Sequence, residues 1–400
     1  MTPNKHNRET APIFLNSAGI ICSLGTGLCS VDKNLFDENK NVSFLRPSNR
    51  NFTDTKLLVG EINESLLEVT LPEEDTRNNR VLTTALDPLV PEINLLKERF
   101  GPSRIGVVIG TSTSGISDGE NALCFHLNHG KFPENYHYRK QEISSPSRYV
   151  SDWLNLQGPV FSVSSACTSG ANALASAARL LRLGVCDAVI AGGVDTLCNM
   201  TIEGFSSLFV TTDSVCNPFS VNRNGINIGE GAGFFLMTLE PSLVRLSGVG
   251  ETSDAYHISS PHPKGDGAEK AMLLALEHSS INPTKIDYLN LHGTGTQQND
   301  KMEALAVHRV FGEKIACSST KPLTGHTLAA AGAIEAVFCW LTLQRNDNKL
   351  PPHHWDGQQD PDLPKLYNIA ADKSQSKPKF VMSNSFAFGG NNTSLILATE

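Results

Sequence analysis

The same order of apolar segments occurs twice along the chain, and this repetition constrains the fold more than any other sequence feature. In the first half, strands are predicted at residues 13–20, 105–109, 161–165 and 233–237. Their counterparts in the second half are residues 243–250, 286–291, 315–319 and 393–397. Four elements that recur in one order predict a duplicated α/β unit with a boundary near Glu240. We therefore expect two α/β halves, at residues 1–240 and 241–400.

The predicted strands and helices indicate how the two halves pack. The strand segments are short, continuous and rich in Val and Ile, as in sheets that helices cover on both faces. A helix with a narrow apolar stripe is predicted after Cys167, and Gly184 is expected to end it. The stripe consists of Ala171, Leu174, Ala175, Ala178 and Leu181. A second helix, at residues 329–343, also begins with small residues, so we expect the two helices to pack together near the middle of the molecule.

Composition and charge exclude several classes of protein. Of the 400 residues, 40% are hydrophobic and 18% are charged, which describes a well-buried globular enzyme. The net charge of −8, without a basic block, argues against a nucleic-acid partner. No apolar run reaches the roughly 18 residues that span a bilayer, and the N-terminus lacks the apolar core of a signal peptide. We therefore expect no membrane partner and a cytoplasmic location.

One of the nine cysteines differs from the others in its sequence context. The cysteines are scattered without a Cys-x-x-Cys pair, so neither a zinc site nor a disulfide framework is predicted. Cys167 lies where a β-rich run ends and an alanine-rich helical pattern begins. The N–H groups at a helix start lower a thiol pKa and can bind an oxyanion. A buried structural cysteine is the alternative, but the glycine-containing helix start favours a nucleophile in acyl chemistry.

Two glycine-flanked histidines follow in the second half of the sequence. His292 begins His-Gly-Thr-Gly-Thr after an apolar segment, and His326 ends Lys-Pro-Leu-Thr-Gly-His before a helix. A helix N-terminus disfavours the imidazolium form, and two neutral rings can each donate an N–H to a carbonyl oxygen that becomes an enolate. Such donors contribute on the order of 3 kcal/mol each. Lys321 is expected to hold a compensating charge or to orient a carboxylate such as Glu335.

Two glycine-rich segments remain. Gly389-Gly390 allows a tight turn before the last strand, and such a loop can present an N–H group and an aromatic ring to the site. The segment Gly-Glu-Gly-Ala-Gly at 229–233 superficially resembles a dinucleotide-binding loop. It leads into a strand instead of a helix, so no dinucleotide site is predicted.

These motifs together resemble those of a known family. They are Ser-Ala-Cys-Thr-Ser-Gly at 165–170, Gly-Glu-Gly-Ala-Gly at 229–233, His-Gly-Thr-Gly-Thr at 292–296, Ser-Thr-Lys at 319–321 with Leu-Thr-Gly-His at 323–326, and Asn-Ser-Phe at 384–386 with Phe-Gly-Gly at 388–390. The chain resembles the β-ketoacyl-acyl carrier protein synthases of dissociated bacterial systems, especially the elongating Cys-His-His type. This resemblance implies an α/β thiolase fold, in which two halves of βαβαβαββ topology form a five-layered α-β-α-β-α sandwich.

The resemblance implies roles for individual residues. Cys167 would accept the acyl group, with the N–H groups of Cys167 and Phe388 as its oxyanion hole, and the Phe388 ring would gate access to the cysteine. His292 and His326 would bind the malonyl thioester carbonyl and promote the loss of carbon dioxide. The resulting carbanion would attack the acyl-cysteine and give a β-ketoacyl thioester that is two carbons longer.

The resemblance also implies supporting residues and partners. Lys321 and Glu335 would support the histidine pair, and no metal or redox cofactor would be needed. The implied partner is an acyl carrier protein that bears acyl and malonyl groups. Because family members are usually dimers, we expect a homodimer or a heterodimer with a related ketosynthase or chain-length-factor subunit.

The sequence departs from the family pattern around the active site. Gln-Gln-Asn at 297–299 stands where Pro and Gly are frequent, and Ala387 replaces a frequent glycine, which predicts a stiffer gating loop. Thr113 aligns with a bulky aliphatic residue that closes the acyl pocket of fatty-acid elongators. Phe209 aligns with an arginine that related enzymes present to the acidic carrier protein. These differences favour a specialised pathway, such as polyketide or aryl polyene assembly, over housekeeping fatty-acid synthesis. Other cations would then bind the carrier, and the candidates are Arg77, Arg80, Arg139 and Lys140.

Two other functions are compatible with parts of the pattern. A cysteine-dependent thioester hydrolase would use Cys167 and one histidine, but it gives no reason for the second glycine-flanked histidine. A non-catalytic partner subunit, similar to a chain-length factor, typically lacks the nucleophile, so Cys167 argues against it. The initiating enzymes of the superfamily use Cys-His-Asn, and His326 argues against that branch.

Overall fold

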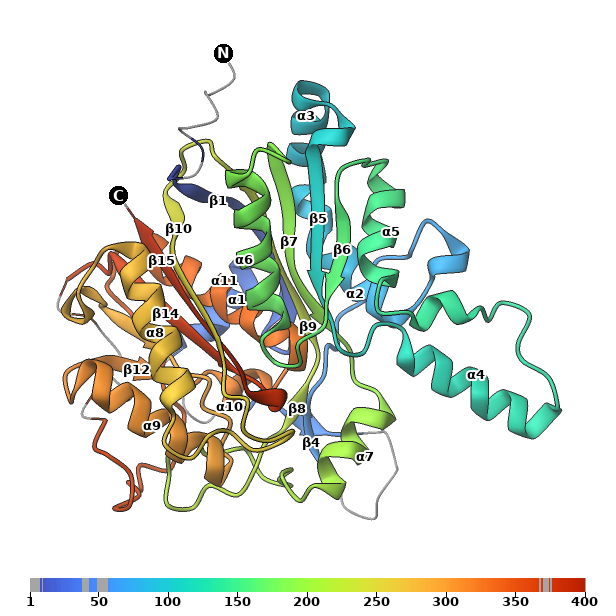
Figure 1. Ribbon diagram of the computed structural model, residues 1–400. Helices are drawn as coiled ribbons and strands as arrows, with labels where there is room; N and C mark the ends of the chain where they lie inside the picture. Colours follow the sequence, from blue (N-terminus) through green and yellow to red (C-terminus); the bar gives the residue numbers. More distant parts are fainter. Residues whose placement is uncertain are drawn as a thin grey trace.

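The computed structural model describes Arg8 and residues 10–37, 43–48, 57–366, 368–369, 374 and 376–399, with the backbone alone at 368–369 (Figure 1). The strands are β1 (Ile13–Cys22), β2 (Gly25–Thr26), β3 (Arg46–Pro47), β4 (Leu58–Gly60), β5 (Ile105–Gly110), β6 (Val160–Val163), β7 (Ala188–Asp195), β8 (Ile228–Gly229), β9 (Gly231–Thr238), β10 (Val244–Ser253), β11 (Tyr288–Asn290), β12 (Ala316–Ser318), β13 (Asn368–Ile369), β14 (Phe380–Phe386) and β15 (Asn391–Thr399). The α-helices are α1 (Leu28–Leu35), α2 (Arg77–Leu86), α3 (Val90–Phe100), α4 (Ile116–His129), α5 (Ser145–Leu154), α6 (Ser169–Arg182), α7 (Asn199–Ser207), α8 (Asp266–Ser279), α9 (Gln297–Phe311), α10 (Lys321–Thr324) and α11 (Ala331–Gln344).

The main sheet contains two sets of five strands with the same internal order. From one edge, the strands follow one another as β13-β12-β11-β14-β15-β10-β1-β9-β7-β5-β6, and β2 pairs with β1. Within each set the first three strands are parallel, as in β6-β5-β7 and β12-β11-β14, and the last two are antiparallel to their neighbours. Numbered along the chain, both sets have the order 3-2-4-5-1, which the expected βαβαβαββ topology requires. The assignment of residues 1–240 and 241–400 to separate domains stays a prediction.

Helices α6 and α11 form the layer between the two sets of strands (Figure 1). α6 contacts β5 and β7, α11 contacts β14 and β9, and the two helices contact each other. Small residues make this contact close, because a Cβ atom added at Gly170 would lie only 2.9 Å from the backbone nitrogen of Ala333 on α11. The expected packing of two small-residue helices in the middle of the molecule is confirmed. Gly184, with φ = 68°, follows the end of α6 as predicted.

Five further helices, α2, α3, α5, α8 and α9, cover the outer faces of the sheet. α2, α3 and α5 pack on the first set of strands, and α8 packs on β10 and β15 with α9 beside it. As a result, β5, β7 and β9 are buried along their whole length, as predicted for strands covered on both faces. The molecule is a five-layered α-β-α-β-α sandwich. In the described part of the chain, no helix combines the length and the apolar character needed to cross a bilayer.

Candidate active site

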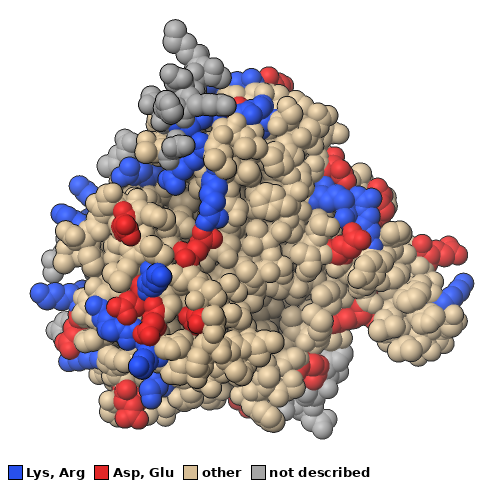
Figure 2. Space-filling view, in the orientation of Figure 1, with Lys and Arg blue, Asp and Glu red and all other residues tan. Residues whose placement is uncertain are grey.

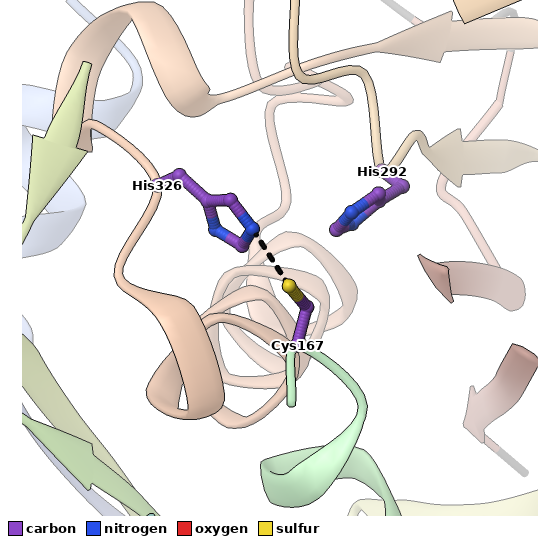
Figure 3. Close-up of side chains that lie close together, drawn as sticks. All are labelled: Cys167, His292 and His326. Atoms are coloured by element: carbon purple, nitrogen blue, oxygen red, sulfur yellow. Dashed lines mark hydrogen bonds between the residues drawn. The ribbon is translucent and has the colours of Figure 1, made fainter. Parts of the chain in front are cut away.

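Cys167, His292 and His326 meet in the interior, although they are far apart in the sequence (Figure 3). Sγ of Cys167 lies 3.0 Å from Nε2 of His326. The ring centroids of the two histidines are 5.3 Å apart, and their planes cross at 83°. The sulfur and one nitrogen of each ring all lie within 4.8 Å of one another, and all three residues are buried. The three side chains can therefore contact a single thioester group at the same time.

A tight turn between β6 and α6 presents the thiol. Ala166, directly before Cys167, has φ = 51°, a left-handed conformation that non-glycine residues rarely adopt. The Ser169 hydroxyl accepts the N–H of Ser165 at 2.9 Å and donates to the carbonyl of Ala166 at 2.6 Å. These hydrogen bonds hold the unusual backbone conformation. The turn directs the thiol towards the two histidines (Figure 3).

The ionisation of this thiol differs from the sequence-based expectation. The helix start predicts a lowered pKa, but burial raises the pKa of Cys167 to about 12. The positive charge of Lys321 and the N–H groups of Phe388 and Cys167 act in the opposite direction without outweighing burial. The expectation is therefore wrong for the substrate-free protein, in which the thiol is neutral near pH 7. A base must remove its proton, and Nε2 of His326 is within hydrogen-bonding distance.

His292 is held by its backbone at the end of β11. The N–H of His292 donates to Glu303 Oε1 at 2.8 Å, and the N–H of Gly293 donates to Oε2 at 2.7 Å. Glu303 lies on α9, which begins directly after the His-Gly-Thr-Gly-Thr segment. Burial raises the pKa of Glu303 to about 7, while the two backbone N–H groups act in the opposite direction. One buried carboxyl group thus fixes the loop from which the imidazole projects.

His326 is also fixed through its backbone. Its N–H donates to the carbonyl of Asn227 at 2.6 Å, and its carbonyl accepts from the N–H of Gly229 at 2.9 Å. Gly325, at φ = 67°, makes the turn between α10 and the histidine. The Gly-Glu-Gly-Ala-Gly segment at 229–233 therefore supports His326, which explains its position among the motifs without any nucleotide.

Both histidine rings are neutral near pH 7. Burial, followed by the positive charge of Lys321, lowers the pKa of His292 well below 6.5, and His326 adds to this effect. The same two causes lower the pKa of His326 well below 6.5. The cause is mainly burial, whereas the sequence had suggested a helix terminus. Each neutral ring carries one N–H donor and one acceptor nitrogen.

A buried ion pair lies beside the histidines. Lys321 Nζ donates to Glu335 Oε1 at 2.6 Å, and the two side chains are 1% and 3% exposed. Lys321 begins α10 and Glu335 lies on α11, so the pair ties the two helices on either side of His326. The partner that the sequence suggested for Lys321 is therefore the observed one. The positive charge reaches both imidazoles and the thiol.

The Phe388 loop closes one side of the site. The N–H of Phe388 contacts the Cys167 thiol, and the Phe388 ring lies 5.6 Å from that of Phe205 on α7. Gly389 and Gly390 have φ of 83° and 76°, while Ala387 is extended at φ = −117°. The alanine therefore occupies a conformation that suits an L-residue, and the glycines provide the turn.

A cavity of about 590 Å³ connects these groups to the surface. It is large enough for the arm of a thioester substrate. Its lining includes Cys167, both histidines, the Phe386–Phe388 region and the end of α7. The residues that line it are Cys167, Phe205, Leu208, Phe209, Val210, Arg223, Asn224, Gly225, Ile226, Ser259, Ser260, Pro261, His292, Thr294, Thr296, Gln297, Gln298, Asn299, His326, Phe386, Ala387, Phe388 and Asn392.

Thr113, which the family resemblance placed in the acyl pocket, lies outside the cavity around Cys167. Its side chain is fully buried, and its hydroxyl donates to Oδ1 of Asp195 at 2.8 Å while accepting the N–H of Thr196 at 3.1 Å. It does not line the cavity described above. A role for Thr113 in an acyl pocket stays a prediction.

The four candidate docking cations are engaged within the protein. Three form ion pairs with carboxylates, and the fourth is only 6% exposed. The pairs are Arg77–Glu230, Arg80–Asp75 and Arg139–Glu74, and the buried residue is Lys140. None of the four lines the cavity among the residues that the structure describes.

Sequence reasoning missed two acidic residues that shape the site. Glu303 holds the His292 loop, and Asp300 accepts the N–H groups of Phe219 and Gly295 at 2.8 and 3.2 Å. Both lie in the first turns of α9, three residues apart, on the face that looks back at the histidine segment. Two acidic residues three positions apart, directly after a glycine-rich loop, were the sequence signal that could have identified them as residues that hold this loop.

The chain matches known proteins along most of its length. Residues 75–241 match the N-terminal domain of beta-ketoacyl synthases, and residues 243–354 match the C-terminal domain. Nodulation protein E of Rhizobium leguminosarum bv. trifolii is 31% identical over 408 residues, which cover 96% of this chain and 98% of that protein. 3-Oxoacyl-(acyl-carrier-protein) synthase 2 of Staphylococcus aureus is 35% identical over 319 residues, which cover 73% and 76%.

Solved structures share the whole fold. A chain in the structure of the ketosynthase ApeO in complex with its chain length factor ApeC, from Xenorhabdus doucetiae, has a TM-score of 0.92 at 40% identity, with both chains fully covered. The ishigamide ketosynthase/chain length factor has a TM-score of 0.86 at 26% identity, with coverage of 98% and 99%. Fold and site thus define a condensing enzyme of the thiolase fold. The chain belongs to the β-ketoacyl synthase family, which confirms the predicted family and fold.

Proposed function

We propose that this protein condenses an acyl group held on Cys167 with a malonyl group on an acyl carrier protein, as a 3-oxoacyl-acyl carrier protein synthase. One observation carries the proposal: a buried thiol and two neutral imidazoles lie within 4.8 Å of one another at the end of a substrate-sized cavity. Membership of the β-ketoacyl synthase family supports the reaction class.

The first step loads the acyl group. The thiol proton moves to Nε2 of His326, and the sulfur attacks the carbonyl carbon of an acyl thioester on the carrier. The N–H groups of Cys167 and Phe388 stabilise the oxyanion that forms. The carbon–sulfur bond to the carrier then breaks, and the carrier sulfur leaves with the proton from His326. The products are an acyl-cysteine and a free carrier thiol.

The second step extends the chain. Once Cys167 is acylated it has no proton to share, so the tautomer of His326 with a proton on Nε2 becomes available to the substrate. His292 and His326 donate to the malonyl thioester carbonyl while the bond to the carboxylate breaks and carbon dioxide leaves. The bonding electrons form an enolate, whose carbon attacks the acyl-cysteine carbonyl. The bond to Cys167 breaks, the released thiolate takes up a proton from water, and the lengthened β-ketoacyl group stays on the carrier.

We also propose a specialised pathway and a related partner subunit. The replacement of the family arginine by Phe209 favours a polyketide or aryl polyene product over a housekeeping fatty acid. The alignment of Thr113 with a bulky pocket residue points the same way, although Thr113 does not line the cavity around Cys167. Two similar structures are named as complexes or assemblies of a ketosynthase with a chain length factor, which favours a heterodimer. All nine cysteines are free thiols, which fits action in the reducing cytoplasm.

Intact-protein mass spectrometry tests the proposal. Incubation with octanoyl-N-acetylcysteamine should add one octanoyl mass to the wild type and none to Cys167→Ala. Addition of malonyl-loaded carrier protein should then remove that mass and yield a β-ketoacyl carrier lengthened by two carbons. Release of free octanoate without a carrier-bound product would instead identify a thioester hydrolase. Absence of loading in the presence of the partner subunit would identify a non-catalytic chain-length-factor-like protein.

A further inference from the structure

Phe209 stands out from the other large apolar residues, because its side chain is 93% exposed. It lies two residues after the end of α7, and Leu208, which precedes it, is 50% exposed. Both residues line the cavity that leads to Cys167, so they lie at its entrance. An apolar surface at the entrance of a substrate cavity marks a contact surface for another molecule.

The backbone of Phe209 is also unusual. Its φ of 55° places an aromatic residue in the left-handed region, where a large L-side chain is strained. Hydrogen bonds hold this turn: the N–H of Phe209 donates to Ser206 at 2.9 Å, and the N–H of Leu208 donates to Phe205 at 3.2 Å. The fold thus accepts backbone strain at a residue whose ring contributes little to the core.

The described residues that line the cavity offer no available charge at its entrance. Among the described residues that line the cavity, Arg223 is the one Lys, Arg, Asp or Glu, and it is buried and paired with Asp360. On the face shown in Figure 2, blue side chains gather over α8 and α9 and beside α5, whereas the surface over α7 is mainly tan with isolated red. A partner with an acidic docking face therefore meets no unpaired cation among the described residues that line the cavity.

We propose that Phe209 and Leu208 form the docking site for the acyl carrier protein, and that the carrier presents apolar side chains to them beside its prosthetic arm. The proposal rests on the proposed function, because a carrier that delivers a thioester to Cys167 must place its arm in this cavity. The apolar character and the exposed ring then select a carrier by hydrophobic contact instead of ion pairing.

This docking site adjoins the gating ring. Phe205, on the same helix, contacts the ring of Phe388 at a centroid distance of 5.6 Å. A carrier seated at the end of α7 therefore lies one side chain away from Phe388, whose N–H contacts the thiol. Docking and opening of the gate can be linked through this short contact.

Acylation kinetics of Cys167 test the proposal. Rates are measured by intact mass with octanoyl-N-acetylcysteamine and with the octanoyl-loaded carrier proteins of the source genome. The readout is the ratio of kcat/KM for carrier to kcat/KM for the small thioester. Phe209→Asn should lower this ratio about tenfold, because an interface aromatic typically contributes that much. Phe209→Leu, which keeps an apolar side chain, should recover most of the loss.

Stability and salt dependence give two independent readouts. Asn tolerates the left-handed region, so the Tm of Phe209→Asn should equal or exceed that of the wild type, which separates docking from a structural role. The wild-type ratio should change less than about twofold between roughly 50 and 500 mM NaCl, because screening does not weaken apolar contacts. Leu95→Ala, which removes a 65% exposed apolar side chain on the distant α3, should leave both kinetic constants unchanged.

Several results would overturn the proposal. An unchanged ratio in Phe209→Asn, or a wild-type ratio that falls more than tenfold with salt, excludes apolar docking. A change in sedimentation coefficient in Phe209→Asn with an unchanged ratio assigns the ring to a subunit contact. If the small thioester loads the wild type while any of these contradicting results is found, the docking proposal is wrong and the proposed function stands. If neither substrate loads the wild type, the proposed function fails first.

Discussion

The two halves of the molecule share a scaffold and contribute different chemistry. In both, a buried carboxylate holds the loop after the second strand of the five-strand set. Asp195 accepts the N–H groups of loop residues 112–113 after β5, at 2.8 Å each. Glu303 accepts those of His292 and Gly293 after β11 at 2.8 and 2.7 Å. The duplicated strand order is thus accompanied by a repeated way of fixing a loop.

The difference lies in the side chains that these loops and the next ones carry. After β6, the first half supplies the thiol of Cys167 at the start of α6. After β12, the second half supplies Lys321 and His326, and its β11 loop adds His292. The first half therefore contributes the nucleophile, and the second contributes the two donors and a positive charge that adds to the effect of burial in keeping them neutral. A conserved scaffold with divergent loops is how one fold acquires a composite site.

Removal of the nucleophile should have the largest effect. Cys167→Ala should leave the fold intact but removes the sulfur that is proposed to hold the acyl group, so condensation should fall by roughly 10⁴-fold or more. Carrier-bound product is measured by mass spectrometry. Cys29→Ala, at an exposed cysteine, serves as the control and should retain full activity. Residual acylation of Cys167→Ala at any other residue would contradict the assignment of chemistry to the first half.

Breaking the buried ion pair should have the next largest effect. Lys321→Met or Glu335→Gln leaves a buried charge without its partner, so the free energy of unfolding should fall by about 3–5 kcal/mol. Urea denaturation measures this quantity. The double variant Lys321→Met with Glu335→Leu should recover much of the stability, since it buries no charge. Recovery of stability without recovery of condensation would show that the pair also acts on the histidines.

The two histidines should be separable by the step that they affect. His292→Ala and His326→Ala each remove one donor worth on the order of 3 kcal/mol, so condensation should fall about 100-fold in each. Nε2 of His326 is 3.0 Å from the thiol, so His326→Ala should slow acylation as well. Single-turnover acylation with octanoyl-N-acetylcysteamine distinguishes the two variants. Equal acylation rates in both would show that the thiol loses its proton to another group.

The sequence predicted the parts of this arrangement that depend on local pattern. Buried Val- and Ile-rich runs marked four of the five strands in each set, and the small-residue stripe predicted the contact of α6 with α11. The strands β7 and β14 were missing from the recognised repetition. The short strands β11 and β12 cover only part of the apolar segments that predicted them, because the last residues of each segment turn into the site loops.

The rest depends on long-range contacts that local pattern does not contain. The predicted pKa of Cys167 was wrong, because burial by residues from both halves outweighs the helix start. The Thr113 hydroxyl donates a hydrogen bond to Asp195, about eighty residues later in the chain, and the sequence around Thr113 gives no indication of this contact. The ion pair of Arg77 with Glu230 likewise engages a cation that the sequence alone suggested as a carrier-docking residue. Motifs located the reacting groups, and tertiary contacts decided their ionisation and surroundings.

Replacement of the two loop-holding carboxylates should sharpen the comparison between the halves. Glu303→Gln exchanges one acceptor oxygen for a donor facing the N–H groups of His292 and Gly293, so condensation should fall about tenfold through misplacement of the ring. Asp195→Asn should lower stability by about 1–3 kcal/mol with a smaller loss of activity, because its loop carries no reacting group. Equal losses of activity in both variants would mean that the two loops serve the same purpose.

The smallest expected effect is the response of condensation to mild acid. A neutral imidazole is the form present above its pKa, and burial and Lys321 hold the pKa of His292 and His326 well below 6.5. Both rings should therefore stay neutral to a lower pH than an unperturbed histidine, which is roughly 90% protonated at about pH 5.5. The condensation rate from preloaded octanoyl-enzyme and malonyl-N-acetylcysteamine should remain above about half of its value near pH 7.5.

Lys321→Met removes one cause of the lowered pKa values, so the acid limb of its pH–rate profile should shift to higher pH. Glu303, with a pKa of about 7, also faces the His292 loop, and the same profile in Glu303→Gln separates its titration from that of the rings. A condensation rate that falls tenfold or more by about pH 5.5 in both the wild type and Glu303→Gln would show that the second half does not keep its donors neutral.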